Sequence, residues 1–462
     1  MNSSAEAGLP PSRAGSLSSV ATPEIARAVP ARRLPAARLA REAVAASTLA
    51  GIVVVVFMFA AAAASGPFRA VVHERFVSSG LPGWINGPLA GLSPGLSDQR
   101  LIVLSVVLFG LYLAAVALAD AMRLSWVVAA ILALHAILLL GPPMWLTDAF
   151  NDLGFARLGA LHGLDPYGAT PAAVPADAVF QYVTWPHLTS PYGPLFTAAS
   201  YALVPFGVSG GLWALKVAVV AGSLGCLVLV WKLAEALERP VAPALVLVAL
   251  NPLVLVYGIG GVHNDPFMLL LVLGGMLWAV RGRAALSGAA MVGAAAMKVT
   301  GGLALPFVWA ASRDRGRVVL GAAAAGAGVV VLSAVLFGSH LGTALTPFSD
   351  QGNATSLRSF PGQISQAFLG QSDVSPTVQV VAHVVFALVL VGLVVRTWRG
   401  GDWIVNAGWA MLALLLTLPW VMPWYVAWLL PFAALGRDRR LRTAALTLTA
   451  FLLVVRMPYP PF

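Results

Sequence analysis

Residues Thr147–Pro194 read TDAFNDLGFARLGALHGLDPYGATPAAVPADAVFQYVTWPHLTSPYGP, a polar stretch between two long apolar blocks. It carries four aspartates and one arginine. A charged side chain in the hydrocarbon core of a bilayer costs about 2.5–3.5 kcal/mol even on the mildest scale, so the stretch predicts an aqueous loop. Long loops in compact architectures usually carry function, and we interpret the rest of the chain as the scaffold that holds this one.

The composition predicts a membrane protein. Of the 462 residues, 59% are hydrophobic and only 10% are charged, well outside the range of an ordinary soluble domain. The formal net charge of +10 therefore indicates basic loops on one side of a membrane and not a surface for nucleic acid. The single cysteine, Cys226, lies in an apolar run, so neither a disulfide nor a cysteine metal site is expected.

The chain divides into an arm and a membrane domain. Residues Met1–Glu42 are rich in Ala, Pro, Ser and Arg and predict a disordered cytoplasmic arm. The run Ala43–Ala64 is long enough to span a bilayer and predicts a retained first helix. We expect residues 43–462 to form one all-α polytopic domain, a bundle of about 11 to 13 transmembrane helices with loops at the outer face.

One apolar segment predicts a hairpin. Leu286–Ala310 has arginines on both flanks, and the positive-inside rule places both flanks in the cytoplasm. Two half-helices broken near Lys298 satisfy that requirement. The resulting topology starts inside and places on the outer face the loops 147–194, 258–266 and 339–376, together with the segment LPWVMPWY near Trp420.

The first outer loop contains paired acids and rigid aromatic turns. Asp148 follows the membrane exit, and Asp152 lies one helical turn later on the same face. Two such carboxylates fit three roles: binding a divalent cation, acting as acid and base, or capping a helix. The turns GLDPY, TWPH and SPYGP contain Tyr167, His187 and Tyr192, and their stiffness suits contact with carbohydrate or an isoprenoid chain.

The segment GIGGVHNDPF, Gly258–Phe267, places three polar residues at a membrane boundary: His263, Asn264 and Asp265. Polar groups next to hydrocarbon predict a functional site. Capping of the following helix by Asn or Asp is the alternative interpretation, and the pattern allows both.

Two cations are candidates for phosphate binding. Lys298 lies at the apex of the predicted hairpin, far from its basic ends, so a buried ammonium there requires an anion. In a bilayer we expect that anion to be a lipid phosphate. Arg358, in the outer segment QGNATSLRSF, is a second candidate, with an ordinary solvated arginine as the alternative.

Together these features resemble the GT-C membrane glycosyltransferases. More narrowly, they are similar to the actinobacterial polyprenyl-phosphate-mannose-dependent α-mannosyltransferases that build lipomannan-type glycolipids. The resemblance is carried by the D-x-x-x-D loop with its later G-x-x-P-Y, by GGVHNDP, by the basic-flanked hairpin with its lysine, and by PWYVAWLLP. It covers most of the chain from about residue 100 onward.

The resemblance implies a hexose, expected to be mannose, carried by a polyprenyl phosphate, and a glycolipid or glycan acceptor at the outer face of the plasma membrane. It implies an aspartate base that deprotonates the acceptor hydroxyl while the anomeric carbon inverts. The family's first loop acid matches Asp148. Many relatives carry a Tyr next, where this chain reads AFND, so the choice between Asp148 and Asp152 stays open.

The remaining candidate residues have supporting roles under this resemblance. His263, Asn264 and Asp265 would line the substrate cavity, and Tyr167, His187 and Tyr192 would contact substrate. Lys298 and Arg358 would neutralise the leaving phosphate. No cofactor is expected, and we predict that the reaction is independent of a metal ion.

Other functions fit parts of the pattern. A polyprenyl-sugar transporter or flippase would show broken helices in both halves of the chain, whereas the sequence shows one broken hairpin. A non-catalytic lipid-binding scaffold would keep Lys298 without needing Asp148. Within the enzyme class, arabinose or glucose could replace mannose, because no residue here identifies the hydroxyl pattern.

Overall fold

The computed structural model describes residues 35–63, 82–89, 92, 96–144, 147–338 and 354–457. The chain divides into two units, Met1–Ala40 and Arg41–Phe462. Of the first unit only the start of one helix is described, so most of the predicted arm, residues 1–34, lies outside the described part. The second unit is helical throughout its described length, apart from turns and connections.

The helices of the N-terminal half are α1 (Pro35–Ala62), α3 (Gly83–Asn86), α4 (Asp98–Leu118), η1 (Ala119–Ala121), α5 (Leu124–Leu140), α6 (Ala149–Ala160), η2 (Pro171–Ala173), η3 (Phe180–Tyr182), α7 (Pro194–Ser200), η4 (Tyr201–Phe206) and α8 (Gly207–Ala236). Those of the C-terminal half are α9 (Val241–Ala249), η5 (Val254–Ile259), α10 (Asp265–Val280), α11 (Ala284–Met297), η6 (Val299–Ala304), α12 (Leu305–Ala311), α13 (Arg315–Phe337), α15 (Phe360–Leu369), α16 (Pro376–Trp398), α17 (Trp403–Thr417), η8 (Pro423–Tyr425), α18 (Val426–Leu435) and α19 (Arg439–Val454).

Five helical stretches in the described residues are long and apolar enough to cross a membrane: Ala36–Ala62, Asp98–Ala121, Pro194–Ala236, Arg315–Phe337 and Pro376–Trp398. Shorter apolar helices accompany them, among them α5, α10, α11 and α17. The prediction of an all-α, multi-pass membrane protein is confirmed. The more exact count of about 11 to 13 spans stays a prediction.

Two predicted loops are partly helical. Residues 35–42, expected to belong to a disordered arm, form the first turns of α1, because PAARLARE combines a proline at the start with strong helix formers. The outer loop predicted at 339–376 contains α15, and its residues 339–353 lie outside the described part.

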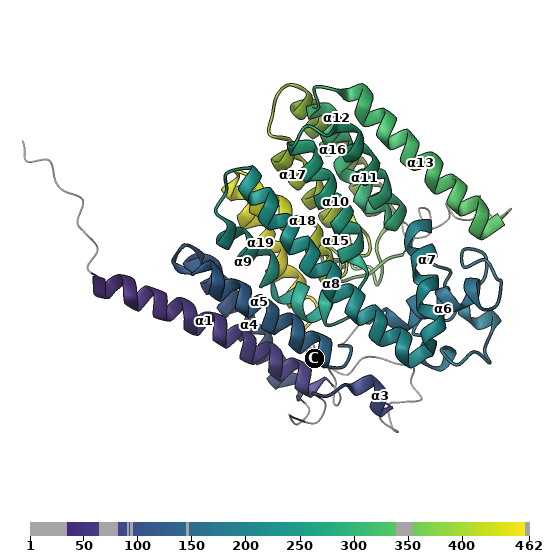
Figure 1. The fold of residues 1–462 in the computed structure, drawn as a ribbon, viewed down its shortest axis with the longest axis horizontal. Helices are drawn as coiled ribbons and strands as arrows, with labels where there is room; N and C mark the ends of the chain where they lie inside the picture. Colours follow the sequence, from purple (N-terminus) through teal and green to yellow (C-terminus); the bar gives the residue numbers. More distant parts are fainter. Residues whose placement is uncertain are drawn as a thin grey trace, which may run out of the picture. The chain divides into compact units, whose positions relative to one another are not determined.

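The stretch 147–194, predicted to be an aqueous loop, is folded, and its exposure to water at the outer face stays a prediction. Its first third forms α6, whose apolar side chains Phe150 and Leu153 pack with Leu212 and Leu215 of α8. These apolar residues, spaced at helical intervals, outweigh the flanking charges and bury the helix. Figure 1 shows α6 and α7 beside the N-terminal part of α8 and the end of α13, so the stretch covers one end of the bundle.

The predicted hairpin is confirmed. Lys298 has an extended backbone, with φ of −154° and ψ of 126°, and separates α11 from η6 and α12. Both ends of the segment lie beside the first turns of α13: Ala285 packs against Gly321, and Arg315 donates a hydrogen bond to the carbonyl oxygen of Ala310 at 3.1 Å. The chain therefore enters and leaves on the same side, and Lys298 is at the apex.

The crossing of α11 and α13 depends on a glycine contact, which gives a first prediction. A Cβ at Gly321 would meet the Ala285 carbonyl group, whereas one at Gly328 on the same helix meets nothing within 4 Å. We expect Gly321→Ala to destabilise the protein by about 1–3 kcal/mol through overpacking. Gly328→Ala, the matched control, should be neutral or stabilising by up to about 1 kcal/mol.

Thermal unfolding of the detergent-solubilised protein, followed by tryptophan fluorescence, measures both effects. Equal Tm values for the two variants would contradict this close packing of α11 against α13.

Candidate active site

Asp148 is held by two polar side chains from distant parts of the chain. It occupies the N-cap position of α6, but its side chain makes no capping hydrogen bond. Its Oδ2 atom instead lies 3.2 Å from Nδ1 of His263 and accepts a hydrogen bond from the Tyr192 hydroxyl at 3.5 Å. The capping interpretation of Asp148 therefore does not describe this structure.

The backbone around His263 is tightly constrained. The π-helix η5 leads into it, and π-helical turns are frequent at functional sites. Val262 has a φ of 59°, a left-handed conformation that is unusual for a β-branched residue and is associated with strained functional sites. At Gly261 a Cβ would meet the Tyr257 carbonyl and the His263 ring. The His263 ring also stacks on Trp424, with centroids 3.5 Å apart, so the imidazole is held in one orientation.

A buried ion pair lies beside this group. Asp265 Oδ1 accepts hydrogen bonds from Lys298 Nζ at 2.9 Å and from Trp428 Nε1 at 2.6 Å. The ammonium also lies 4.9 Å from the Tyr425 ring centre and 5.1 Å from that of Trp428. Asp265 therefore supplies an anion for Lys298, and two aromatic rings cover the ammonium, while the expected contact of Lys298 with a lipid phosphate stays a prediction.

Buried polar atoms without partners gather at the same place. His263 Nε2, Asn264 Nδ2 and Asp265 Oδ2 have no hydrogen-bond partner among the described residues. Asn264 occupies the N-cap position of α10 without a side-chain capping bond, so its predicted alternative role is not seen. Buried polar atoms are normally paired, and a ligand rich in hydroxyl groups would pair these three.

The two acids of the first motif differ sharply in environment. Asp152 is completely buried, while the Asp148 side chain is 26% exposed. Burial, followed by the neighbouring Asp148 carboxylate, raises the pKa of Asp152 well above its ordinary value, with Tyr192 and Lys298 opposing the shift. The raised pKa disfavours the charged form of the buried Asp152, and Asp148 is the carboxylate that a substrate can reach.

Tyr167 is buried and is linked to Tyr192 through two hydroxyl side chains. Its ring is 3% exposed, and its hydroxyl donates a hydrogen bond to Thr197 Oγ1 at 2.9 Å. Thr197 Oγ1 lies 3.3 Å from Ser190 Oγ, which accepts a hydrogen bond from the Tyr192 backbone N–H at 3.5 Å. This chain of contacts makes Tyr167 a positioning residue for Tyr192, in contrast to the predicted substrate contact.

Exposed aromatic rings lie at the edge of the site. His187 is exposed, and two residues earlier Trp185 is 43% exposed. The Trp185 ring packs edge-on against Trp420, with centroids 6.5 Å apart. Asn151 Oδ1 accepts hydrogen bonds from the backbone N–H groups of Thr184 and Trp185, which fixes this turn on α6. The TWPH and LPW motifs signal this surface in the sequence.

A second basic group lies near the lysine. Arg358 is exposed, and Arg456 is buried with its Nη2 donating to the Val421 carbonyl oxygen at 2.9 Å. The charges of these two arginines influence each other, and Tyr425 is close enough to interact with both Lys298 and Arg456. Sequence reasoning missed Arg456, because its one signal is an isolated arginine at the end of an apolar helix.

In the part of the chain that the structure describes, no group of three or more His, Cys, Asp or Glu side chains is arranged to hold a metal ion. Independence from metal stays a prediction.

Two sequence families match the chain. Residues 47–313 match the family described as "Alpha-(1->6)-mannopyranosyltransferase, N-terminal domain", and residues 353–460 match "MptB C-terminal domain". The chain belongs to the alpha-(1->6)-mannopyranosyltransferase family. The predicted resemblance to actinobacterial mannosyltransferases is confirmed by this match. The matched residues include every site residue described above.

Individual relatives cover parts of the chain. It is 37% identical over 183 residues to alpha-(1->6)-mannopyranosyltransferase A of Mycobacterium tuberculosis, covering 38% of this chain and 34% of that protein. It is 27% identical over 318 residues to alpha-(1->6)-mannopyranosyltransferase A of Corynebacterium glutamicum, covering 61% of this chain and 64% of that protein. The aligned part is thus less than two thirds of either relative. No solved structure matches the chain.

The Asp265–Lys298 pair predicts strong thermodynamic coupling. Removing one partner of a buried ion pair leaves the other charge uncompensated, so Lys298→Met or Asp265→Asn alone should each destabilise the protein by about 3–5 kcal/mol. The double variant should lose much less unfolding free energy than the two single variants added together, because no isolated charge remains. Chemical or thermal unfolding of the four proteins in detergent measures the coupling, and additive losses would contradict the pairing.

Proposed function

We propose that this protein transfers a mannosyl residue from a polyprenyl-phosphate donor to a hydroxyl group of a glycolipid or glycan acceptor, forming an α-linkage. The observation that carries the proposal is the accessible Asp148 carboxylate, held by His263 and Tyr192 and surrounded by buried polar atoms that lack partners. The names of the relatives, which specify α-(1→6)-mannopyranosyl transfer, support mannose over arabinose or glucose and suggest a 6-hydroxyl acceptor.

In the proposed reaction Asp148 is the general base. Its carboxylate takes the proton of the acceptor hydroxyl while that oxygen forms a bond to the anomeric carbon. The bond from that carbon to the phosphate oxygen breaks, and its electron pair leaves with the lipid phosphate. One displacement inverts the anomeric centre, so a β-linked donor gives an α-linked product. Asp152 is less suited to this role, because it is completely buried and cannot contact a substrate from solvent.

The leaving phosphate requires positive charge that is not already neutralised. Lys298 is paired with Asp265, whereas Arg358 and Arg456 form no ion pair with the residues that the structure describes. Guanidinium groups bind phosphate oxygens in a two-pronged geometry. We therefore assign the phosphate to Arg358 and Arg456, and we assign Lys298 the role of holding Asp265 in place.

The aromatic edge provides a surface for the acceptor. Trp185, in the folded stretch that carries Asp148, is exposed and packs against the partly buried Trp420. Flat aromatic faces bind apolar sugar faces and lipid chains, which suits a glycolipid. We place His187 at the rim of this surface, where it would contact the acceptor.

Asp148→Asn tests the base assignment. We expect transfer from synthetic polyprenyl-phosphate-mannose to a short mannoside to fall by about 10²- to 10⁴-fold in membrane fractions, with donor binding retained. Asp98→Asn removes an exposed carboxylate outside the site and should leave turnover unchanged. Wild-type turnover in Asp148→Asn would exclude Asp148 as the base.

Cysteine labelling tests the proposed outer face. Ala176 is exposed, while its neighbour Asp177 binds Arg157 and His162 and should be left intact. The one native cysteine, Cys226, is buried. A cysteine at Ala176→Cys should react with an impermeant maleimide added to intact cells, and one at Arg281→Cys should react only after permeabilisation. The reverse pattern would place the active site in the cytoplasm.

A further inference from the structure

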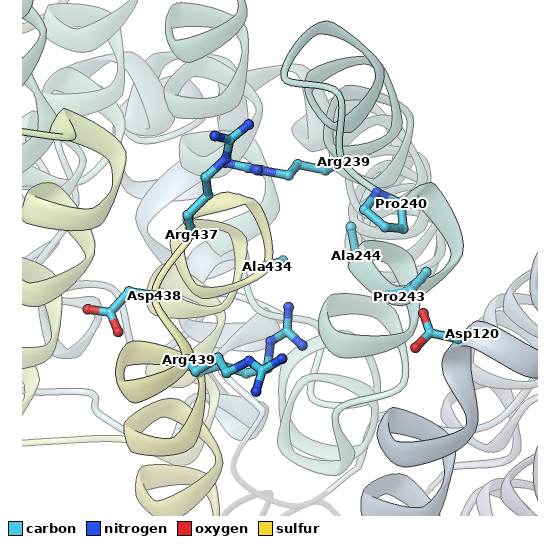
Figure 2. A pocket seen from close by; sticks show the side chains of 11 residues that line it. Asp120, Arg239, Pro240, Pro243, Ala244, Ala434, Arg437, Asp438 and Arg439 are labelled. Carbon is cyan, nitrogen blue, oxygen red and sulfur yellow. The ribbon is translucent and has the colours of Figure 1, made fainter. Parts of the chain in front are cut away.

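A pocket rich in arginine lies away from the active site. Its volume is about 290 Å³, and its charged lining residues are Asp120, Arg239, Arg437, Asp438, Arg439 and Arg442. It is formed by the turn between α8 and α9, the turn between α18 and α19, and η1 (Figure 2). None of these residues contributes to the site that contains Asp148.

The pocket lies at the opposite end of the helices that carry the active site. Helix α5 begins after Asp120 and ends shortly before Asp148. Its 17 residues correspond to about 25 Å at 1.5 Å per residue. Helix α18 likewise begins next to Trp424 and ends just before Arg437. The two sites are therefore separated by the length of the bundle.

The pocket has an excess of positive charge. Of its two acids, Asp438 is already engaged: Oδ1 accepts hydrogen bonds from the backbone N–H groups of Arg440 and Leu441, and Oδ2 accepts one from Trp409 Nε1 at 2.9 Å. Figure 2 shows its carboxylate directed away from the labelled arginines. Across the described ranges, none of the four arginines forms an ion pair.

These arginines are placed at an electrostatic cost. The side chains of Arg239 and Arg437 approach each other in Figure 2, and burial together with Arg437 lowers the pKa of Arg239. Arg439 and Arg442 lie in the first turns of α19, where the positive end of the helix dipole disfavours cations. The positive-inside rule accounts for basic residues in the loops predicted to be cytoplasmic, and the structure adds that four of these arginines line one pocket.

We propose that the four-arginine pocket binds a phosphate group. Clustered guanidinium groups match the several oxygens of a phosphate monoester or diester, and basic pockets between transmembrane helices bind anionic headgroups. The apolar part of the lining, Pro240, Pro243 and Ala244, suits the glycerol and chain that follow a headgroup. A free phosphate compound offers the same chemistry without that apolar part.

A bound phosphate would join the two turns that form the pocket. Arg239 Nε already donates a hydrogen bond to the Leu435 carbonyl oxygen at 3.1 Å, so the turns touch at one point. A phosphate bound by Arg239 and Arg437 would fix the end of α18, whose other end carries Trp428 and directly follows η8 with Trp424 of the active site. The pocket is thus a stabilising site, distinct from catalysis.

The test measures thermal stabilisation of the purified full-length protein in a neutral detergent. Phosphatidylglycerol is the anionic lipid under test, and phosphatidylcholine is the lipid control. Inorganic phosphate tests a soluble ligand, and sodium chloride at the same ionic strength is its control. The variant is Arg439→Gln/Arg442→Gln, which should fold because it relieves the helix dipole. The control is Arg281→Gln/Arg283→Gln, which removes two exposed arginines outside the pocket.

We expect phosphatidylglycerol to raise Tm of the wild type and of the control. In the pocket variant the lipid concentration for a half-maximal shift should rise about tenfold or more. An equivalent shift with inorganic phosphate alone would assign the pocket to a soluble phosphate. Equal shifts in both variants, or none with any phosphate, would overturn the proposal. Should the double variant misfold, Arg437→Gln provides the same comparison.

Discussion

The buried pair between Asp265 and Lys298 is the interaction on which this structure depends. It joins the start of α10 to the apex of the α11–α12 hairpin, and Trp428 attaches the same carboxylate to α18. Neither charge is stable alone in a low-dielectric interior, so the three elements must meet at one point. The break at Lys298 is therefore both a local interruption of a helix and the contact that assembles the site.

Near that pair, the carboxylate of Asp148 is accessible, whereas those of Asp152 and Asp265 are buried. Asp148 is partly exposed, Asp152 is buried with a raised pKa, and Asp265 is neutralised by a lysine. This arrangement avoids the repulsion that three ionised carboxylates would suffer at short range. The strained turn at Val262 and the unpaired atoms of His263 and Asn264 indicate that stability is given up locally for binding.

The two ends of the bundle have opposite chemistry. One end gathers acids, aromatic rings and a folded polar stretch, and the other gathers arginines around the turns before α9 and α19. The helices α5 and α18 connect the two ends directly. Because α18 carries Trp428 near its start and the arginine turn follows its end, a phosphate at the second site would stabilise a helix that also contributes to the first site.

The sequence by itself determined the features that follow from local composition. Its apolar runs predicted a multi-pass helical protein, and the flanking arginines predicted the hairpin around Lys298. The HND motif predicted a polar cluster at a membrane boundary. Each prediction follows from the cost of placing charge in hydrocarbon. Only the tertiary structure decided the partners, which are Asp265 for Lys298 and His263 for Asp148, and it also decided that Asp152 is buried. Arg456 carried no motif, and the basic run 437–442 gave no sign that it forms a pocket with Arg239 of a distant segment. Such pairings depend on packing between distant segments, which the order of residues along one helix does not specify.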